Sequence, residues 1–210
     1  MQTNFTPEQL GDPAMQSSEK ILRTCVHCGF CTATCPTYLL LGDELDSPRG
    51  RIYLMKEMFE SGKPATPEVV KHIDRCLSCL ACMTTCPSGV HYMHLVDHGR
   101  AYIETTYQRP WHDRLIRWLL ARVLPYPKRF RLALAAARLG KPLKGAVGAL
   151  PLVGNRLWAM LELAPARLPA RAPTEDPGVF KAEGARRGRV ALLSGCAQPI
   201  LKPAFNRAAI

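Results

Sequence analysis

Eight of the nine cysteines in this 210-residue chain fall into one spacing that occurs twice. The first copy runs from Cys25 to Pro36 and the second from Cys76 to Pro87, and both read C-x2-C-x2-C-x3-C-P. This spacing is typical of bacterial-type sites that bind [4Fe–4S] clusters through thiolates. Because such clusters carry single electrons, the repeated pattern predicts two clusters and an electron-transfer function.

Three cysteines spaced three residues apart can reach one cluster only from a tight loop. A straight helix would spread the first three cysteines over roughly 9 Å of rise. Gly29 suits such a loop because glycine takes positive φ at no steric cost, and Ala81 is the matching small residue of the second copy. Pro36 and Pro87 fix φ and turn the chain as it leaves each loop.

In two-cluster ferredoxins with this spacing, the fourth cysteine of one run ligates the cluster held by the other run. Carried over to this chain, the rule predicts two crossed ligand sets. Cluster 1 would take Cys25, Cys28, Cys31 and Cys86. Cluster 2 would take Cys76, Cys79, Cys82 and Cys35. Crossed ligation would hold the clusters close enough for electrons to pass between them.

Disulfide bonds and zinc are the two alternatives for so many cysteines. Disulfides require an oxidising compartment, and the first residues, MQTNFTPEQL, show neither the basic nor the apolar region of a secretory signal. Zinc sites usually combine well-separated C-x2-C pairs or mix cysteine with histidine. The doubled run fits neither alternative, so we favour iron–sulfur clusters in a reducing cytoplasm.

The chain carries a net charge of +11, and all of the excess lies in one segment. Residues 111–190 hold 16 Lys and Arg against 5 Asp and Glu, whereas the rest holds 12 of each. A basic segment can bind nucleic acid, anionic lipid or an acidic partner. These charges are scattered among prolines, so we expect no nucleic acid. No run reaches the 18 apolar residues of a membrane span, which leaves a peripheral position on the cytoplasmic face of the inner membrane open.

Helical periodicity and capping residues predict a mainly α fold. Ser47-Pro48 reads as an N-cap and first helical residue, with Gly62 as the stop, and Thr66-Pro67 starts a second helix in the same way. A longer helix spans about His91 to Gln108. The long helical gap between the cysteine runs predicts an α-helical two-cluster domain over residues 1–110, not a compact β-hairpin ferredoxin. The predicted apolar faces comprise Ile52, Met55, Met58, Phe59, Val69, Val70, Ile73, Leu95, Tyr102 and Ile103.

Two further regions follow this domain. Residues 111–188 read as a basic helical and linker region that opens with one apolar helix side: Trp111, Leu115, Trp118, Leu119, Val123 and Leu124. We favour packing of this side on its own protein; binding of a partner or of anionic lipid is the alternative. Residues 189–210 read as an incomplete α/β unit, in which a β run from Val190 to Leu193 precedes a helix from Pro203. We expect the chain to be the front part of a longer protein.

Several motifs together resemble the iron–sulfur subunit of bacterial glycolate oxidase. They are Arg23 to Cys31 with Cys35 to Tyr38, Gly42 to Ile52 (GDELDSPRGRI), Cys76 to Val90, and Ser194 to Pro199 (SGCAQP). The cysteine pattern alone is shared with the anaerobic glycerol-3-phosphate dehydrogenase small subunit and with heterodisulfide reductase subunits, which are the alternative. The Asp-Ser-Pro-Arg-Gly-Arg element between the two cysteine runs favours the glycolate oxidase family over these alternatives.

The resemblance implies an accessory subunit that carries electrons only. FAD would lie on a partner glycolate oxidase subunit that oxidises glycolate or D-lactate, and electrons would pass through both clusters toward a quinone-type acceptor. No catalytic residues are expected here, because the sequence shows no catalytic dyad, phosphate loop or flavin fingerprint. Family members continue into Cys-Cys-Gly domains, of which residues 189–210 would be the start. Cys196 alone is not assigned as a ligand.

Residues around the cysteines would tune the cluster potentials through hydrogen bonds and charge. His27 lies inside the first loop, and we favour an exposed loop histidine over a cluster ligand. Arg49 and Arg51 would lie near cluster charge or face an acidic partner, with a solvated helix face as the alternative. Hydroxyl donors are expected at Thr32, Thr34, Ser78, Thr84 and Thr85.

Overall fold

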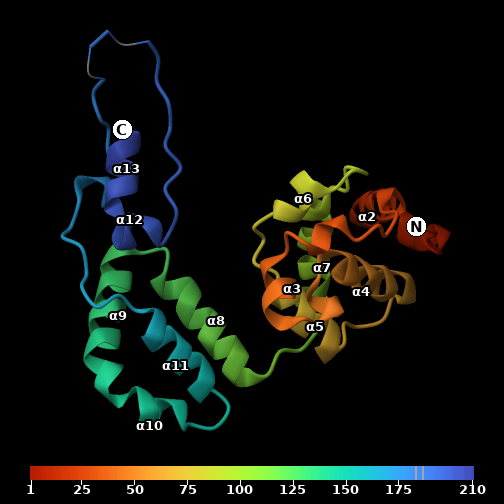
Figure 1. Cartoon of the computed structure of the whole chain (residues 1–210), viewed down its shortest axis with the longest axis horizontal. Helices are drawn as coiled ribbons and strands as arrows, with labels where there is room; N and C mark the ends of the chain where they lie inside the picture. Colours follow the sequence, from red (N-terminus) through yellow and green to blue (C-terminus); the bar gives the residue numbers. More distant parts are fainter. Residues whose placement is uncertain (183, 186) are drawn as a thin grey trace. The chain divides into compact units, whose positions relative to one another are not determined.

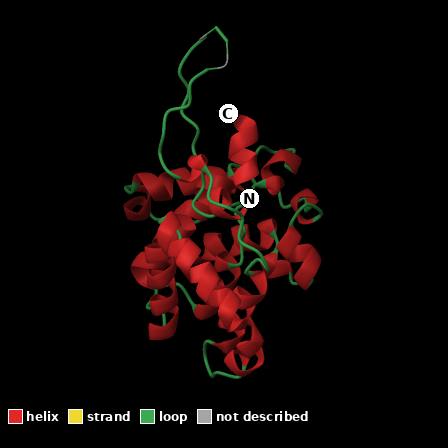
Figure 2. Ribbon diagram, turned by 90° about the vertical axis from the view of Figure 1, so that its left-hand side faces the viewer, coloured by secondary structure: helices red, strands yellow, loops and turns green. Residues whose placement is uncertain are grey.

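The computed structural model describes residues 1–182, 184–185 and 187–210. Within these ranges every regular element is a helix and none is a strand, as Figure 2 shows. The helices form two compact units, Met1–Gln108 and Arg109–Ile210. The prediction of a mainly α fold is confirmed.

Short helices build the first unit, and most of them begin at a proline. They are α1 (Pro7–Leu10), α2 (Pro13–Thr24), α3 (Pro36–Leu41), α4 (Pro48–Ser61), α5 (Pro67–Asp74), α6 (Ala81–Thr85) and α7 (Tyr92–Thr106), with 3-10 turns η1 (Phe30–Thr32) and η2 (Glu44–Asp46) (Figure 1). Proline is tolerated at the first helical position because the N–H it lacks would have no partner there. Side-chain oxygens cap the first turns of α1, α2, α4 and α5, from Thr6, Asp12, Ser47 and Thr66.

The core of the first unit lies where α2, α4, α5 and α7 pack together. Its fully buried side chains include Leu22, Met55, Ile73, Leu95 and Ile103. The predicted apolar faces of α4, α5 and α7 all join this core, with Val69 and Tyr102 at its partly buried edge.

Gly50 lets the turn η2 lie directly against α4. A Cβ at this position would lie 2.0 Å from the backbone oxygen of Glu44, far closer than a Cβ approaches any atom to which it is not bonded. A second close approach occurs at Gly99 of α7, where a Cβ would lie 2.7 Å from Met55 Sδ. The first neighbour is backbone, whereas the second is part of a flexible side chain.

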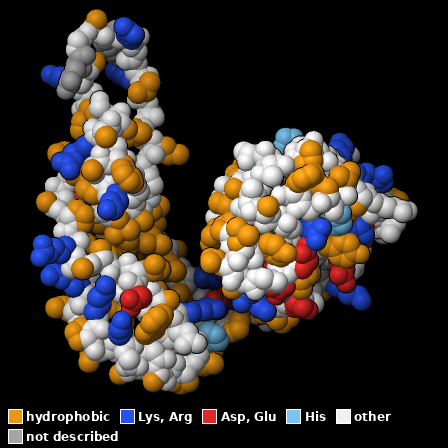
Figure 3. All heavy atoms as spheres, viewed as in Figure 1, with side chains coloured by type: hydrophobic (Ala, Val, Ile, Leu, Met, Phe, Trp, Pro, Cys, Tyr) orange, Lys and Arg blue, Asp and Glu red, His pale blue; other side chains and the backbone are white. Residues whose placement is uncertain are grey.

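The second unit contains α8 (Trp111–Val123), α9 (Pro127–Gly140), α10 (Lys144–Gly148), α11 (Gly154–Leu163), α12 (Gln198–Leu201) and α13 (Pro203–Ala209), with 3-10 turns η3 (Lys141–Leu143) and η4 (Pro173–Glu175). Its core is small and gathers Phe130, Leu134, Ala164 and Ile200. Lys and Arg side chains are spread over the face of this unit seen in Figure 3. No helix in the described ranges is long and apolar enough to cross a membrane.

For the second unit, one expectation is wrong and another holds only in part. Residues 190–193 form no strand, and Val190 and Leu193 are almost fully exposed. A strand needs a partner for its backbone hydrogen bonds, and the described part of the chain holds no other strand. The apolar side that begins at Trp111 packs against the core at its end, through Val123 and Leu124, whereas Trp111 and Trp118 remain 68% and 54% exposed. The expected helix from Pro203 is present as α13.

Replacing Gly50 with alanine should destabilise the first unit more than replacing Gly99. The new methyl group at position 50 meets backbone, so η2 must move away from α4, and overpacking of this kind costs about 1–3 kcal/mol or more. At position 99 the Met55 side chain can change its rotamer. In urea denaturation followed by far-UV circular dichroism, the wild type should therefore have the highest midpoint, Gly99→Ala a lower one and Gly50→Ala the lowest. Equal midpoints for all three proteins would contradict this packing.

Candidate metal centre

The two cysteine loops adopt the same backbone conformation. The third and fifth residues of each loop have positive φ: 58° at His27 and 84° at Gly29, then 52° at Ser78 and 59° at Leu80. The left-handed conformation costs a non-glycine residue roughly 1–2 kcal/mol. Repetition of the same strain in both copies indicates that the surrounding structure imposes the loop shape.

The prediction that Ala81 takes the place of Gly29 is wrong by one residue. Leu80 is the residue with positive φ, and Ala81 is the first residue of α6. Residue size did not predict that Leu80 corresponds to Gly29, because the second loop has a strained leucine where the first has glycine.

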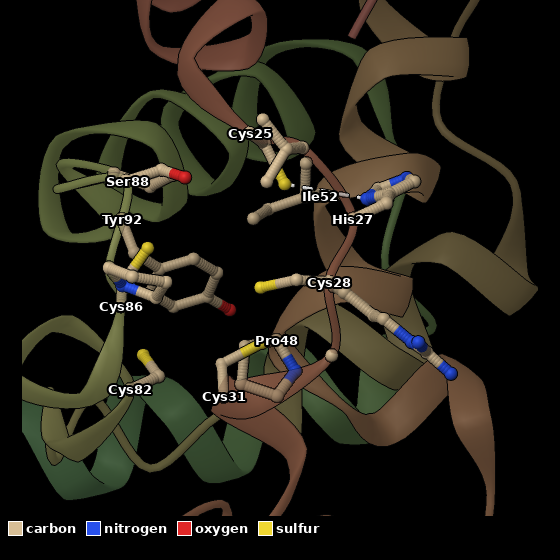
Figure 4. A pocket seen from close by; sticks show the side chains of 15 residues that line it. Cys25, His27, Cys28, Cys31, Pro48, Ile52, Cys82, Cys86, Ser88 and Tyr92 are labelled. Carbon is tan, nitrogen blue, oxygen red and sulfur yellow. Dashed lines mark hydrogen bonds between the residues drawn. The ribbon is translucent and has the colours of Figure 1, made fainter.

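A first hollow of about 430 Å³, which includes space open to solvent, lies beside the first cysteine loop. Figure 4 shows sulfur atoms directed into it from different sides, from Cys25, Cys28, Cys31, Cys82 and Cys86. Ile52 and Val90 add apolar walls, and His27 and Arg49 lie at its lining. This hollow gathers the four cysteines of the predicted cluster 1 together with Cys82.

The second hollow measures about 320 Å³ and is lined by Cys35, Cys76, Cys79 and Cys82. These are the four cysteines of the predicted cluster 2. Pro48, Cys82 and Tyr92 line both hollows, so the two hollows are neighbours. Cys86 therefore lies with the first run and Cys35 with the second, which is the grouping of a crossed arrangement. The ninth cysteine, Cys196, is exposed in the second unit.

The donor set of both hollows fits an iron–sulfur cluster. Neither lining contains a carboxylate; the first offers five thiols and the second four, beside apolar residues. Burial raises the pKa of Cys82 to about 12, and burial also raises the pKa values of Cys25 and Cys31. Thiols of this kind become thiolates when a bound metal displaces the proton. Soft thiolate ligands in a water-poor site suit iron–sulfur clusters.

Cys35 is the exception, because hydrogen-bond donors surround its sulfur. Thr37 Oγ1 lies 3.2 Å from Cys35 Sγ, and Arg51 Nη1 donates to it over 3.8 Å. Burial works against the Cys35 thiolate, but the Thr37 hydroxyl, backbone amides and the Arg51 charge outweigh burial and lower its pKa. The pKa direction of Cys35 is thus opposite to that of Cys25, Cys31 and Cys82.

A buried group of charged residues, which we call the Asp46 network, supports this end of the site. Asp46 is fully buried, and its carboxylate lies 3.3 Å from Arg51 Nη2, 2.9 Å from His72 Nδ1 and 2.7 Å from Arg75 Nη1. Burial raises the pKa of Asp46, but hydrogen bonds from His72 and Arg75 outweigh burial and lower it. The network consists of Asp46, Arg51, His72 and Arg75.

Arg51 connects this network to the second hollow. Its side chain is 1% exposed, and besides Asp46 it donates from Nε to the His72 carbonyl (2.7 Å) and from Nη2 to Thr37 Oγ1 (3.0 Å). The alternative of a solvated helix face is therefore wrong for Arg51. Arg49 is different: its side chain is 38% exposed and pairs with Glu44 at 2.5 Å, while its guanidinium lies over Gly29.

The second loop has two supports that spacing alone did not reveal. Tyr92 OH donates to Cys76 Sγ over 3.6 Å, and burial holds the pKa of this tyrosine well above its usual value, so it stays a donor. Arg100 donates to the Cys76 carbonyl (2.7 Å) and to Ser78 Oγ (2.6 Å). Both residues come from α7, and only the tertiary fold brings them to the loop.

The hydroxyl groups expected to tune the site mostly bond to backbone. Thr32 donates to the Gly29 carbonyl and Thr34 to the Cys31 carbonyl. Thr84 and Thr85 both donate to the Ala81 carbonyl. These residues shape the loops and do not contact sulfur, whereas Thr37, two residues after Cys35, does. His27 Nδ1 lies 3.4 Å from Cys25 Sγ.

Residues 21–90 match the protein family described as 4Fe-4S dicluster domain. The match covers both cysteine loops, the Asp46 network and the helices between them. Residues 21–90 of the first unit are therefore similar to a family of the class that the cysteine spacing predicted.

Over nearly its full length the chain is similar to the glycolate oxidase iron-sulfur subunit of Escherichia coli (strain K12). The two are 43% identical over 208 residues, which are 99% of this chain and 46% of that protein. The chain is also 32% identical to the probable glycolate oxidase iron-sulfur subunit of Bacillus subtilis (strain 168) over 182 residues, 83% of this chain and 41% of the relative. It thus spans about half the length of these curated relatives. No solved structure matches it. The resemblance predicted from the motifs is confirmed.

Replacing Asp46 with asparagine should unfold the first unit selectively. The substitution keeps the side-chain shape but leaves Arg51 buried without its counter-charge, and breaking a buried pair costs about 3–5 kcal/mol. Far-UV circular dichroism during urea denaturation should show an early transition. The fluorescence transition should not move, because all three tryptophans, Trp111, Trp118 and Trp158, belong to the second unit.

Asp43→Asn is the matched control. This side chain is 40% exposed and lies 4.0 Å from His72 Nε2, so the change should cost less than about 0.5 kcal/mol. Equal midpoints for Asp46→Asn and Asp43→Asn would show that the buried carboxylate is not what holds this region together.

Proposed function

We propose that this chain carries the two-cluster, electron-transfer part of an iron–sulfur subunit of a flavin-dependent glycolate dehydrogenase, with D-lactate as a second substrate. The observation that carries the proposal is a pair of neighbouring hollows, lined by five and four cysteines of the doubled run and sharing Cys82. Similarity along 99% of the chain to a glycolate oxidase iron-sulfur subunit supports the choice of complex. An iron–sulfur subunit of another redox complex, of the glycerol-3-phosphate dehydrogenase or heterodisulfide reductase type, is the alternative.

The eight cysteines are proposed to hold two [4Fe–4S] clusters in crossed sets. One set is Cys25, Cys28, Cys31 and Cys86; the other is Cys76, Cys79, Cys82 and Cys35. Cys82 lines both hollows, but it belongs to the second loop, and the first hollow has four cysteines without it. Such clusters, when bound, accept and release single electrons.

The polypeptide itself positions the sites. Pro48 and Tyr92 lie between the hollows and hold them side by side. Arg100 and the loop threonines fix the loop backbones. Arg51 and Tyr92 direct hydrogen-bond donors at the sulfurs of Cys35 and Cys76, and Thr37 Oγ1 accepts from Arg51 and so holds its guanidinium.

Substrate oxidation is assigned to a partner. No flavin fingerprint occurs in this sequence, so FAD is placed on a partner glycolate oxidase subunit, with a quinone-type acceptor beyond the clusters. The exposed apolar side of α8 and the basic excess of residues 111–190 are compatible with peripheral contact at an anionic membrane on the cytoplasmic side. Residues 189–210 are proposed as the start of a Cys-Cys-Gly type domain.

Alanine variants of the fourth cysteines test the crossed ligand sets. Cys86→Ala should remove the same electron paramagnetic resonance signal as Cys28→Ala, because both belong to the first hollow. Cys35→Ala should remove the other signal, together with Cys79→Ala. Iron content should fall from about eight to about four atoms per chain in each case.

Cys196→Ala is the control for these variants and should keep full iron content. If Cys86→Ala instead removed the signal that Cys79→Ala removes, ligation would follow the order of the runs and the crossed scheme would be wrong.

Reduction by substrate tests the choice of complex. The chain, co-expressed with its FAD-binding partner and purified without oxygen, should bleach in visible absorbance when glycolate or D-lactate is added. Glycerol 3-phosphate should have no effect. Bleaching by glycerol 3-phosphate with no response to glycolate would favour the alternative complex.

A further inference from the structure

We propose that Arg51, aided by Thr37 and Tyr92, makes the second hollow the site of the higher reduction potential, so that an electron shared by the two clusters resides there. The inference rests on the proposed two-cluster function and concerns how the chain distinguishes two sites built from the same cysteine spacing. It follows from an asymmetry in what contacts the sulfur atoms, and each contact is given by a named side chain.

In the second hollow a guanidinium and a phenol hydroxyl donate to the sulfurs, whereas the Thr37 hydroxyl beside Cys35 donates to the Asp46 carbonyl (2.9 Å) and accepts from Arg51. Cys35 Sγ has Thr37 Oγ1 at 3.2 Å and Arg51 Nη1 at 3.8 Å, and Cys76 Sγ has Tyr92 OH at 3.6 Å. Reduction adds a negative charge to a cluster and its thiolates. Hydrogen bonds and positive charge directed at the sulfur therefore stabilise the reduced form and raise its potential.

The charge of Arg51 is partly balanced by the Asp46 carboxylate, 3.3 Å away, but solvent does little to screen it. Arg51 is 1% exposed, so little water screens it. Its negative partner, Asp46, also pairs with Arg75, so that one carboxylate does not neutralise both guanidinium groups.

Among the described residues, no buried guanidinium donates to a sulfur of the first hollow. His27 Nδ1 lies 3.4 Å from Cys25 Sγ, and backbone amides of His27 and Arg49 lie at the sulfurs of Cys25 and Cys31. Arg49 lies at its lining but is 38% exposed and paired with Glu44, and exposed pairs contribute little. The amino group of Met1 is also near, but it donates to the backbone carbonyls of Arg23 and Cys25.

Potentiometric titration followed by electron paramagnetic resonance tests the proposal on the anaerobically purified complex. Arg51→Gln should lower the higher of the two midpoint potentials by at least a tenfold change in the reduction equilibrium, about 59 mV for one electron. The lower of the two midpoint potentials should differ from its wild-type value by no more than the experimental error. Arg51→Lys keeps the charge and should retain most of the wild-type value.

Arg49→Gln is the matched control, since it removes the same charge from the same helix beside the other hollow. It should leave the higher potential unchanged. An equal shift from Arg49→Gln would mean that overall charge, not the buried contact, sets the potential, and the proposal would fail. It would also fail if Arg51→Gln moved neither potential, both equally, or only the lower one.

If the Arg51→Gln protein assembles no clusters, two milder variants test the proposed higher potential of the second site. Thr37→Val and Tyr92→Phe each remove one hydroxyl and should each lower the higher potential, by less than Arg51→Gln would. The higher-potential signal must also be the one that disappears in Cys35→Ala. An unchanged higher potential in both variants would overturn the proposal. A wild-type protein without two clusters would instead refute the proposed function, so the two failures are distinguishable.

Discussion

The buried carboxylate of Asp46 is the contact on which the first unit depends. It joins η2 to α4 through Arg51, and to α5 and the residue that follows it through His72 and Arg75. A buried charge is tolerated only when it is paired and hydrogen-bonded, so these segments must meet at one place. Arg51 reaches from that place to Cys35. The same network that orders the helices between the cysteine loops thus touches a predicted cluster ligand.

This arrangement gives each residue of the Asp-Ser-Pro-Arg-Gly-Arg element a definite place. Asp46 centres the network, Ser47 caps α4, Pro48 lines both hollows, and Gly50 admits η2. Arg49 covers the first loop and Arg51 supports the second hollow. One short segment therefore links the packing of the unit to both sites, although the two loops lie about fifty residues apart.

Local patterns predicted the helices and the cysteine loops because their causes are local. Ser47-Pro48 and Thr66-Pro67 start helices through capping chemistry, and apolar spacing marked the buried faces of α4 and α7. The burial of Arg51, the donor Tyr92 and the strained Leu80 were not predictable, because each depends on contacts made across the fold. The strand expected at residues 190–193 failed for a related reason: β propensity without a pairing partner does not make a strand.

The central claim is that the two neighbouring hollows hold two [4Fe–4S] clusters. The most direct test is to purify the wild-type protein without oxygen, measure iron and acid-labile sulfide, and record low-temperature electron paramagnetic resonance after reduction. The account predicts about eight iron and about eight sulfide per chain, with signals from two interacting clusters. Zinc in place of iron, with no visible absorbance and no signal on reduction, would contradict it.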